Sequence, residues 1–170
     1  MRIAHVLARL SLLLLFASPA AMPLPAMADP VVRGEEHCVI NTRSDDRLNV
    51  RDGPSVDYDV IGRWRNAKCG IFVYERCRGN WCPVDDGHIA GWAHRRYLAM
   101  VSPAMYCVTG IRRGDVLNLR AYPSASSRIL VELDRHQCDI AFLPFAVGSW
   151  QKIRVDGWEG WASRRYLSAE

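Results

Sequence analysis

The chain contains 170 residues, with 22 Lys and Arg against 18 Asp and Glu, so its formal net charge at pH 7 is only +4. No long block of basic residues accompanies this mild charge. The composition therefore argues against a nucleic-acid partner and against binding to an anionic membrane surface.

The first 28 residues have the features of a signal peptide. Arg2 and Arg9 form a basic start, Leu10–Ala17 is an apolar run, and Ala26-Met27-Ala28 offers the small residues of a cleavage site. A retained anchor is the alternative, but the apolar run is shorter than the roughly 20 residues that a membrane span needs. We expect cleavage near Ala28, a periplasmic or secreted protein, and no membrane insertion after cleavage.

Two stretches that lie 69 residues apart are nearly the same. Residues 48–55 read LNVRDGPS and residues 117–124 read LNLRAYPS, while residues 91–98 read GWAHRRYL and residues 160–167 read GWASRRYL. A fixed offset without gaps indicates two copies of one module of about 60 residues. The predicted organisation is a signal peptide over 1–28, a lead over 29–37, a first domain over 38–100, a linker over 101–106 and a second domain over 107–170.

The apolar pattern of each copy is that of β-strands. Short runs that are alternating or rich in β-forming residues are separated by turn-forming stretches such as DGPS, RGN and DDGH, which favours an all-β barrel or sandwich. In the first copy the expected strands lie, in chain order, at Cys38–Ile40, Leu48–Val50, Val60–Trp64, Ile71–Tyr74, Trp81–Val84 and Gly91–Ala93.

All six cysteines follow the expected leader. In an oxidising compartment an even number of cysteines predicts disulfides, and the spacings lack the tight Cys and His pairs of a zinc site, so no metal is expected. Cys38 and Cys69 recur as Cys107 and Cys138, which predicts one bond within each copy. Cys77 and Cys82 have no counterparts in the second copy and flank an expected hairpin tip, where they can pair locally.

The combined motifs resemble the bacterial SH3 (SH3b) domain family. The resemblance rests on LNVRDGPS, VIGRW, NWCPV and GWAHRRYL in the first copy, and on LNLRAYPS, SWQKI and GWASRRYL in the second. It implies two tandem SH3-like small β-barrels, and relatives of this kind are cell-envelope modules that bind wall peptides or other proteins. The second copy departs from the pattern at Tyr122, where the family usually has glycine.

The sequence gives no sign of catalytic chemistry or of a cofactor. The cysteines are expected in disulfides, the histidines are scattered, and Asp85-Asp86-Gly87-His88 is typical of a turn. We therefore expect a non-catalytic exported binding module that docks on peptidoglycan or its stem peptides. The alternative is a protein-interaction adaptor that positions a separate periplasmic enzyme or sensor.

If the protein binds wall material as its relatives do, the ligand is expected near the loop after the first LNVRDGPS motif. The candidate ligand-binding residues are Asn49, Tyr58, Trp64 and Trp92. Tyr58 and Trp64 are included because the second copy has no aromatic residue at either equivalent position. The competing interpretation is that these aromatic side chains cover the core.

Overall fold

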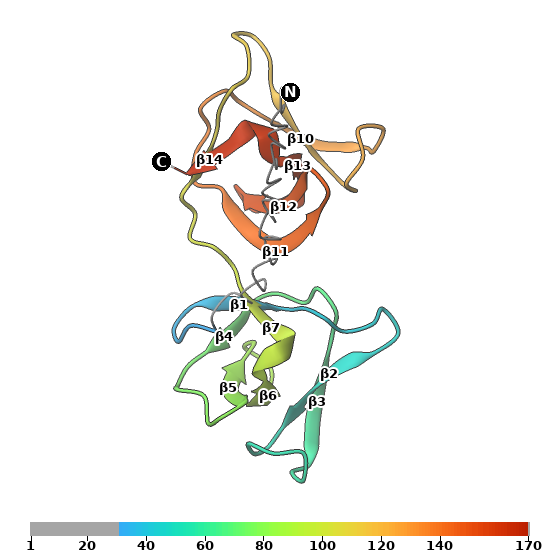
Figure 1. Ribbon diagram of the computed structural model, residues 1–170, viewed down its shortest axis with the longest axis vertical. Coiled ribbons are helices and arrows are strands. Elements are labelled where there is room, and N and C mark those ends of the chain that lie inside the picture. Colours follow the sequence, from blue (N-terminus) through green and yellow to red (C-terminus); the bar gives the residue numbers. More distant parts are fainter. Residues whose placement is uncertain (1–30, 170) are drawn as a thin grey trace, which may run out of the picture.

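A computed structural model describes residues 31–169, so the expected signal peptide lies outside the described residues. Within this range the chain forms β-strands and two short 3-10 helices, which confirms the predicted all-β class. No helix of the described residues is long and apolar enough to cross a membrane. Figure 1 shows the strands gathered into two groups, here called the first half (residues 31–100) and the second half (residues 106–169).

The first half contains one antiparallel sheet with the strand order β3-β2-β6-β5-β4-β1-β7. The elements are β1 (Glu36–Val39), β2 (Arg47–Arg51), β3 (Val60–Arg65), β4 (Ile71–Val73), β5 (Trp81–Asp85), β6 (Ala90–His94), the 3-10 helix η1 (Arg95–Tyr97) and β7 (Leu98–Met100). The DDGH stretch forms the β5–β6 turn, where the Asp86 carboxylate accepts hydrogen bonds from the backbone N–H groups of His88 and Ile89.

The second half has a five-stranded sheet with the order β10-β9-β13-β12-β11, and β14 pairs separately with β8. Its elements are β8 (Tyr106–Val108), β9 (Leu117–Arg120), β10 (Ile129–Leu133), β11 (Ala141–Val147), β12 (Trp150–Val155), β13 (Trp158–Ser163), η2 (Arg164–Tyr166) and β14 (Leu167–Ala169). This five-strand order matches β3-β2-β6-β5-β4 of the first half.

Neither sheet closes on itself through the strand pairings found among residues 31–169. In the first half β3 and β7 remain the two edges of the sheet, and in the second half β8 and β14 form a separate pair. The prediction of two closed SH3-like barrels is thus met only at the level of an all-β fold.

Each half encloses its own apolar core because alternate side chains of its strands point inward. In β2, Leu48 and Val50 are buried while their neighbours are not, and both join a core with Ile71, Val84 and Leu98. The second core has the same design. It is built by Val108, Leu119, Leu133, Ile140 and Ile153 with their neighbours.

The three predicted disulfides are present, joining Cys38 to Cys69, Cys107 to Cys138 and Cys77 to Cys82. The first two each link residues 31 positions apart. The loop-entropy estimate for such a link is about 3 to 4 kcal/mol. This matters because a domain of about 60 residues buries too little surface to be more than marginally stable alone.

A buried glutamine stands where the second half lacks the third disulfide. Gln151 is the counterpart of Cys82, and it lies opposite Ala146, the counterpart of Cys77. Its Nε2 donates to the carbonyl oxygens of Leu143 and Phe145 at 2.7 and 3.1 Å, while its Oε1 accepts from Arg164. The register of β11 and β12 shifts between Phe142 and Ala146, so the amide holds the bulge of β11 in place.

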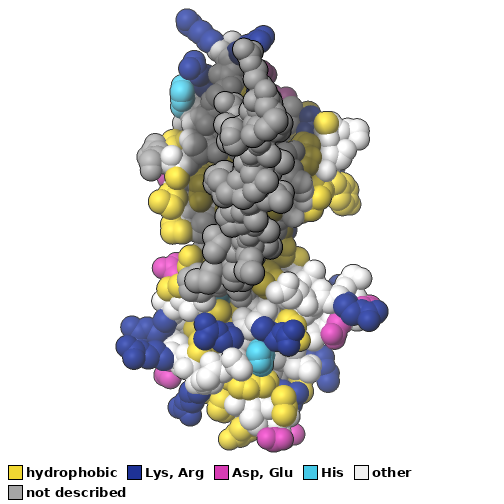
Figure 2. All heavy atoms as spheres, viewed as in Figure 1, with side chains coloured by type: hydrophobic (Ala, Val, Ile, Leu, Met, Phe, Trp, Pro, Cys, Tyr) yellow, Lys and Arg dark blue, Asp and Glu magenta, His cyan; other side chains and the backbone are white. Residues whose placement is uncertain are grey.

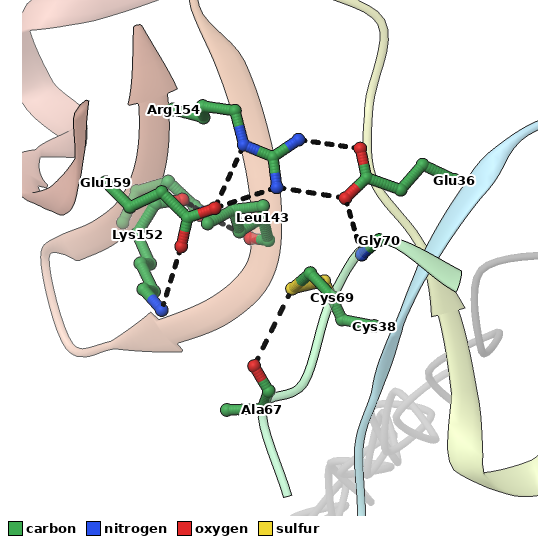
Figure 3. The surroundings of a disulfide bond; sticks show 10 residues. Glu36, Cys38, Ala67, Cys69, Gly70, Leu143, Lys152, Arg154 and Glu159 are labelled. Atoms are coloured by element: carbon green, nitrogen blue, oxygen red, sulfur yellow. Dashed lines mark hydrogen bonds and ion pairs between the residues drawn. A yellow bond between two sulfur atoms is a disulfide. The ribbon is translucent and has the colours of Figure 1, made fainter. Parts of the chain in front are cut away.

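The two halves are joined by a small apolar cluster and an ion-pair network. Cys38 of the first half and Val101, which directly follows that half in the chain after β7, pack with Ala141 and Leu143 of the second half. Beside them the guanidinium of Arg154 in β12 donates two hydrogen bonds to the Glu36 carboxylate in β1, at 2.6 and 2.9 Å, as Figure 3 shows.

The Glu36 carboxylate is held from both sides. It also accepts from the backbone N–H of Gly70 at 2.8 Å. Arg154 in turn bonds Glu159 at 2.7 Å, so a single guanidinium spans two carboxylates. The hydrogen bond from Arg154 is the main cause that lowers the pKa of Glu36 below 4.5, against the opposing effect of burial.

We predict that Glu36→Gln lowers the free energy of unfolding by about 1 to 2 kcal/mol at neutral pH, since a charge-assisted pair that is partly exposed is lost. A carboxyl whose pKa is lowered on folding stabilises the protein above the pKa of the unfolded chain, and this stabilisation is lost as the pH falls. The difference between wild type and variant should therefore shrink below about pH 4.5. Chemical denaturation across a pH series measures it, with the exposed Glu35→Gln as control. A difference in unfolding free energy that does not change with pH would contradict the stabilising role of the ionised Glu36 carboxylate.

We also predict that Gln151→Ala lowers the free energy of unfolding by about 1 to 3 kcal/mol, because the carbonyl groups around the bulge lose their donor. Gln137→Ala is the control, since its amide bonds lie at the surface and should cost less. Thermal melts of both variants compare the two effects. Equal losses of stability in the two variants would contradict the prediction, because the buried Gln151 amide would then contribute no more than the surface amide of Gln137.

Candidate functional site

A groove of about 290 Å³ opens on the first half beside β2 and η1. It is called the η1 groove below. Two groups of side chains line it, one aromatic and one rich in arginine, and they come from β2, β5, β6, η1 and the loops next to them. The lining residues are Thr42, Asp46, Arg47, Leu48, Asn49, Arg51, Val56, Trp81, His94, Arg96 and Tyr97.

Three rings form the aromatic wall. Trp81 and His94 face each other across β5 and β6, and their ring centroids are 5.4 Å apart in an edge-to-face arrangement. The His94 and Tyr97 centroids lie 6.0 Å apart, also edge to face. All three rings are half-buried. Their positions are fixed by the elements that contain them, which are β5, β6 and η1.

His94 is the residue that distinguishes the two repeated octapeptides. Its Nδ1 accepts a hydrogen bond from the backbone N–H of Arg96 at 3.3 Å and so caps η1, whereas Ser163 makes no side-chain cap at η2. Burial lowers the pKa of His94, and the charges of Arg96 and Arg95 lower it further. At pH 7 the ring is therefore neutral, and with Nδ1 accepting, its proton is on Nε2.

The arginines of the groove have different roles. Arg51 Nη1 donates to the carbonyl oxygens of Val56 and Tyr58 at 2.9 and 2.7 Å, which fixes the loop after β2. In the second half, Arg120 Nη1 donates to the carbonyl oxygen of Ser127 in the same way. The Arg51 Nε is buried and has no hydrogen-bond partner among the described residues.

Positive charge exceeds negative charge at the η1 groove. Arg47 and Arg96 line it without a carboxylate partner within residues 31–169, and the Arg96 guanidinium lies 5.1 Å from the centroid of the Tyr97 ring. Asp46 is the acidic residue of the lining, and its Oδ1 accepts from the backbone N–H of Arg47. On the face seen in Figure 2, Lys and Arg side chains gather mainly over the lower half, which is the first half. The groove is thus suited to an anionic group beside an apolar or planar one.

The second half lacks the same combination. Ile111, Val116 and Ser163 stand at the positions of Thr42, Arg47 and His94. A cavity does lie beside η2, but its lining includes neither a tryptophan nor a histidine. The structure therefore indicates that the halves have different surfaces at equivalent places.

One of the four sequence-predicted ligand residues lies in the η1 groove. Asn49 lines it and accepts from Arg63 Nε at 3.1 Å. Trp64 is buried in the core with only 4% exposure, so it offers no surface to a ligand. Trp92 lies outside the lining, with the Arg78 guanidinium 5.1 Å from its ring centroid.

Tyr58 belongs to the loop that Arg51 braces, and its half-exposed ring lies against Gly53. A Cβ added to Gly53 would meet ring atoms of Tyr58 at 2.3 to 2.5 Å. In the second half this pair is inverted, because Tyr122 replaces the glycine and Ser127 replaces the tyrosine. Each loop thus contains one tyrosine, provided from opposite ends, and this explains why glycine is absent at position 122.

We predict that Gly53→Ala costs about 1 kcal/mol of stability because the new methyl group displaces the Tyr58 ring. In a Tyr58→Ala background the same change should cost close to nothing. A double-mutant cycle from denaturation curves measures the coupling. Additive effects of the two substitutions would contradict the contact.

The sequence-based prediction missed every lining residue of the η1 groove except Asn49, including Trp81, His94, Arg96 and Tyr97. The signal was present, since His94 is the one difference between GWAHRRYL and GWASRRYL. Among the described residues no cluster of His, Cys, Asp or Glu could hold a metal ion, and all six cysteines are in disulfides.

No family model matches the chain. The chain is 27% identical over 138 residues to a Bacillus subtilis (strain 168) protein named "Putative N-acetylmuramoyl-L-alanine amidase YrvJ", in an alignment that covers 74% of this chain and 26% of the relative. Two solved structures from Trichomonas vaginalis, NlpC2 and NlpC1, are each 14% identical, with TM-scores of 0.38 and 0.37. The alignments cover 80% and 86% of this chain and 48% and 51% of those chains. The chain therefore spans about a quarter of the curated relative and about half of each structure.

The match to a protein named as an amidase contradicts the sequence-based prediction of a non-catalytic binding module or adaptor. It likewise contradicts the prediction that the protein is not an enzyme. That prediction rested on the cysteines being in disulfides, on the scattered histidines and on the turn-like Asp85-Asp86-Gly87-His88. The expected relation to peptidoglycan agrees with the name of the relative.

Proposed function

We propose that this protein acts in peptidoglycan hydrolysis, at the amide bond between the N-acetylmuramoyl group and L-alanine. The η1 groove is the substrate site in this proposal. One observation carries it: the groove places a neutral histidine beside a tryptophan face, together with arginines that have no carboxylate partner among the described residues. The amidase-named relative supports the choice of reaction.

The chemistry of the groove suits a wall peptide. Stem peptides carry carboxylates, and the guanidinium groups of Arg47 and Arg96 can bind a carboxylate through paired hydrogen bonds. The face of Trp81 can stack on a peptide plane and loses little entropy on doing so. The Nε2–H of His94 is a donor for a substrate carbonyl oxygen, and such a bond stabilises the negative charge that develops there during hydrolysis.

The proposal includes an export step and a fold family. We propose that the protein is periplasmic or secreted, in agreement with the leader-like residues 1–28 and with three disulfides. We also propose that the two halves are SH3b units, supported by the quoted motifs and by the shared order of five strands.

Incubation of the purified protein with peptidoglycan sacculi tests the reaction. Cleavage at the proposed bond releases stem peptides with a new L-alanine amino terminus, which amine labelling and mass spectrometry detect. We expect release above a protein-free control, and no new L-alanine amino termini would overturn the proposal.

Variants of the groove test the site. Trp81→Ala and His94→Ser should each lower the rate of peptide release by about tenfold, the effect of losing roughly 1.4 kcal/mol of transition-state binding. Trp150→Ala is the matched control, because Trp150 holds the position of Trp81 in the second half. A control variant as slow as Trp81→Ala, with all melting temperatures unchanged, would place the site elsewhere.

A further inference from the structure

A second groove lies where the two halves meet, and it is called the junction groove here. It has a volume of about 480 Å³, with Asn41 and Asn66 on the side of the first half and Phe145, Lys152 and Trp161 on the side of the second. A neighbouring cavity of about 420 Å³ shares the central lining residues with it, so the hollow continues along the junction. Both volumes are in the range of small-molecule sites.

The walls of the junction groove are fixed by contacts already described. The bulge of β11, held by the Gln151 amide, forms the wall at Phe145. The Glu36–Arg154 pair and the cluster around Cys38 and Leu143 keep the halves together beside it (Figure 3). A groove whose walls are already held by such contacts needs less reorganisation to receive a ligand.

Among the described residues, those that line the junction groove include one charged side chain, and it is paired. This side chain is Lys152, and its Nζ lies 3.6 Å from a Glu159 carboxylate oxygen and 5.4 Å from the Phe145 ring centroid. Figure 3 shows Glu159 between Lys152 and Arg154. In the η1 groove, by contrast, Arg47 and Arg96 have no carboxylate partner within residues 31–169. The two grooves therefore suit ligands of different charge, and the junction groove suits a neutral one.

Two asparagine side chains bring amide groups to the junction groove. The Asn41 Nδ2 already donates to the Arg96 carbonyl oxygen, which leaves its Oδ1 to accept. The Asn66 Oδ1 already accepts from the Thr42 hydroxyl, which leaves its Nδ2 to donate. The N–H and C=O of an acetamido group match these two atoms, and a sugar ring can stack on the Trp161 face opposite.

We infer that the junction groove binds the glycan strand of peptidoglycan through its uncharged N-acetylated sugar rings. This inference rests on the proposed function and deepens it, since the η1 groove then takes the peptide and the junction groove takes the sugars to which the peptide is attached. A substrate held at both points would be bound more tightly than either part alone.

The test uses a neutral N-acetylglucosamine tetramer that has no stem peptide, titrated into the protein by calorimetry or followed by NMR shifts. We expect binding that Trp161→Ala weakens at least about tenfold, as expected when one stacked ring is lost. Trp92→Ala is the matched control, because Trp92 holds the same position in the first half and does not line the junction groove. Asn66→Ala, on the opposite wall, should also weaken binding and provides a second variant should Trp161→Ala not fold.

A neutral ligand further predicts affinity that stays the same as salt rises from about 0.05 to 0.5 M. No tetramer binding, or equal loss in the Trp161 and Trp92 variants, would overturn the inference. If the wild-type protein binds the tetramer but releases no peptide from sacculi, only the proposed reaction is overturned. Peptide release without tetramer binding would overturn the junction site alone.

Discussion

The contact between Glu36 and Arg154 is the constraint on which the arrangement of the two halves depends. The two residues are 118 positions apart, and their paired hydrogen bonds join a strand of one sheet to a strand of the other. Geometry of this kind is specific, because a guanidinium donates two parallel bonds to one carboxylate only in a narrow range of orientations. Together with the cluster of Cys38, Val101, Ala141 and Leu143, it turns two small domains into one body with a shared groove.

At two equivalent places, the hairpin tip and the loop after the LN motif, the two halves use different residues to hold the same backbone arrangement. A disulfide holds the β5 hairpin tip in the first half, and a buried amide does so at the matching place in the second. Gly53 and Tyr58 in one loop correspond to Tyr122 and Ser127 in the other. Gly53 leaves space for the Tyr58 ring in the first loop, whereas the Ser127 hydroxyl accepts a hydrogen bond from the Tyr122 backbone N–H in the second.

The all-β class, the strand positions and the disulfides could be predicted from sequence because they depend on local patterns and on spacing that occurs twice. Each expected strand of the first half overlaps an observed one, from Cys38–Ile40 on β1 to Gly91–Ala93 on β6. The candidate site was harder, since burial depends on which face of a strand meets the core. Trp64 and Trp81 look alike in sequence, yet the first fills the core and the second lines the groove. The junction groove could not be predicted, because it requires the relative position of two sheets.

The glutamine of the second half has a consequence for the order in which the chain matures. A hairpin held by a disulfide reaches its final form only after oxidation, whereas one held by an amide does so as soon as the backbone folds. The hairpin of β11 and β12 therefore needs no disulfide at its tip. Cys77 and Cys82 are five residues apart, so their bond closes a small ring and needs no distant partner. The Cys38–Cys69 bond instead draws together residues 31 positions apart in the half that meets this hairpin. Independence from oxidation is thus confined to the hairpin of the second half, because the Cys107–Cys138 bond must still form in that half as the Cys38–Cys69 bond does in the first.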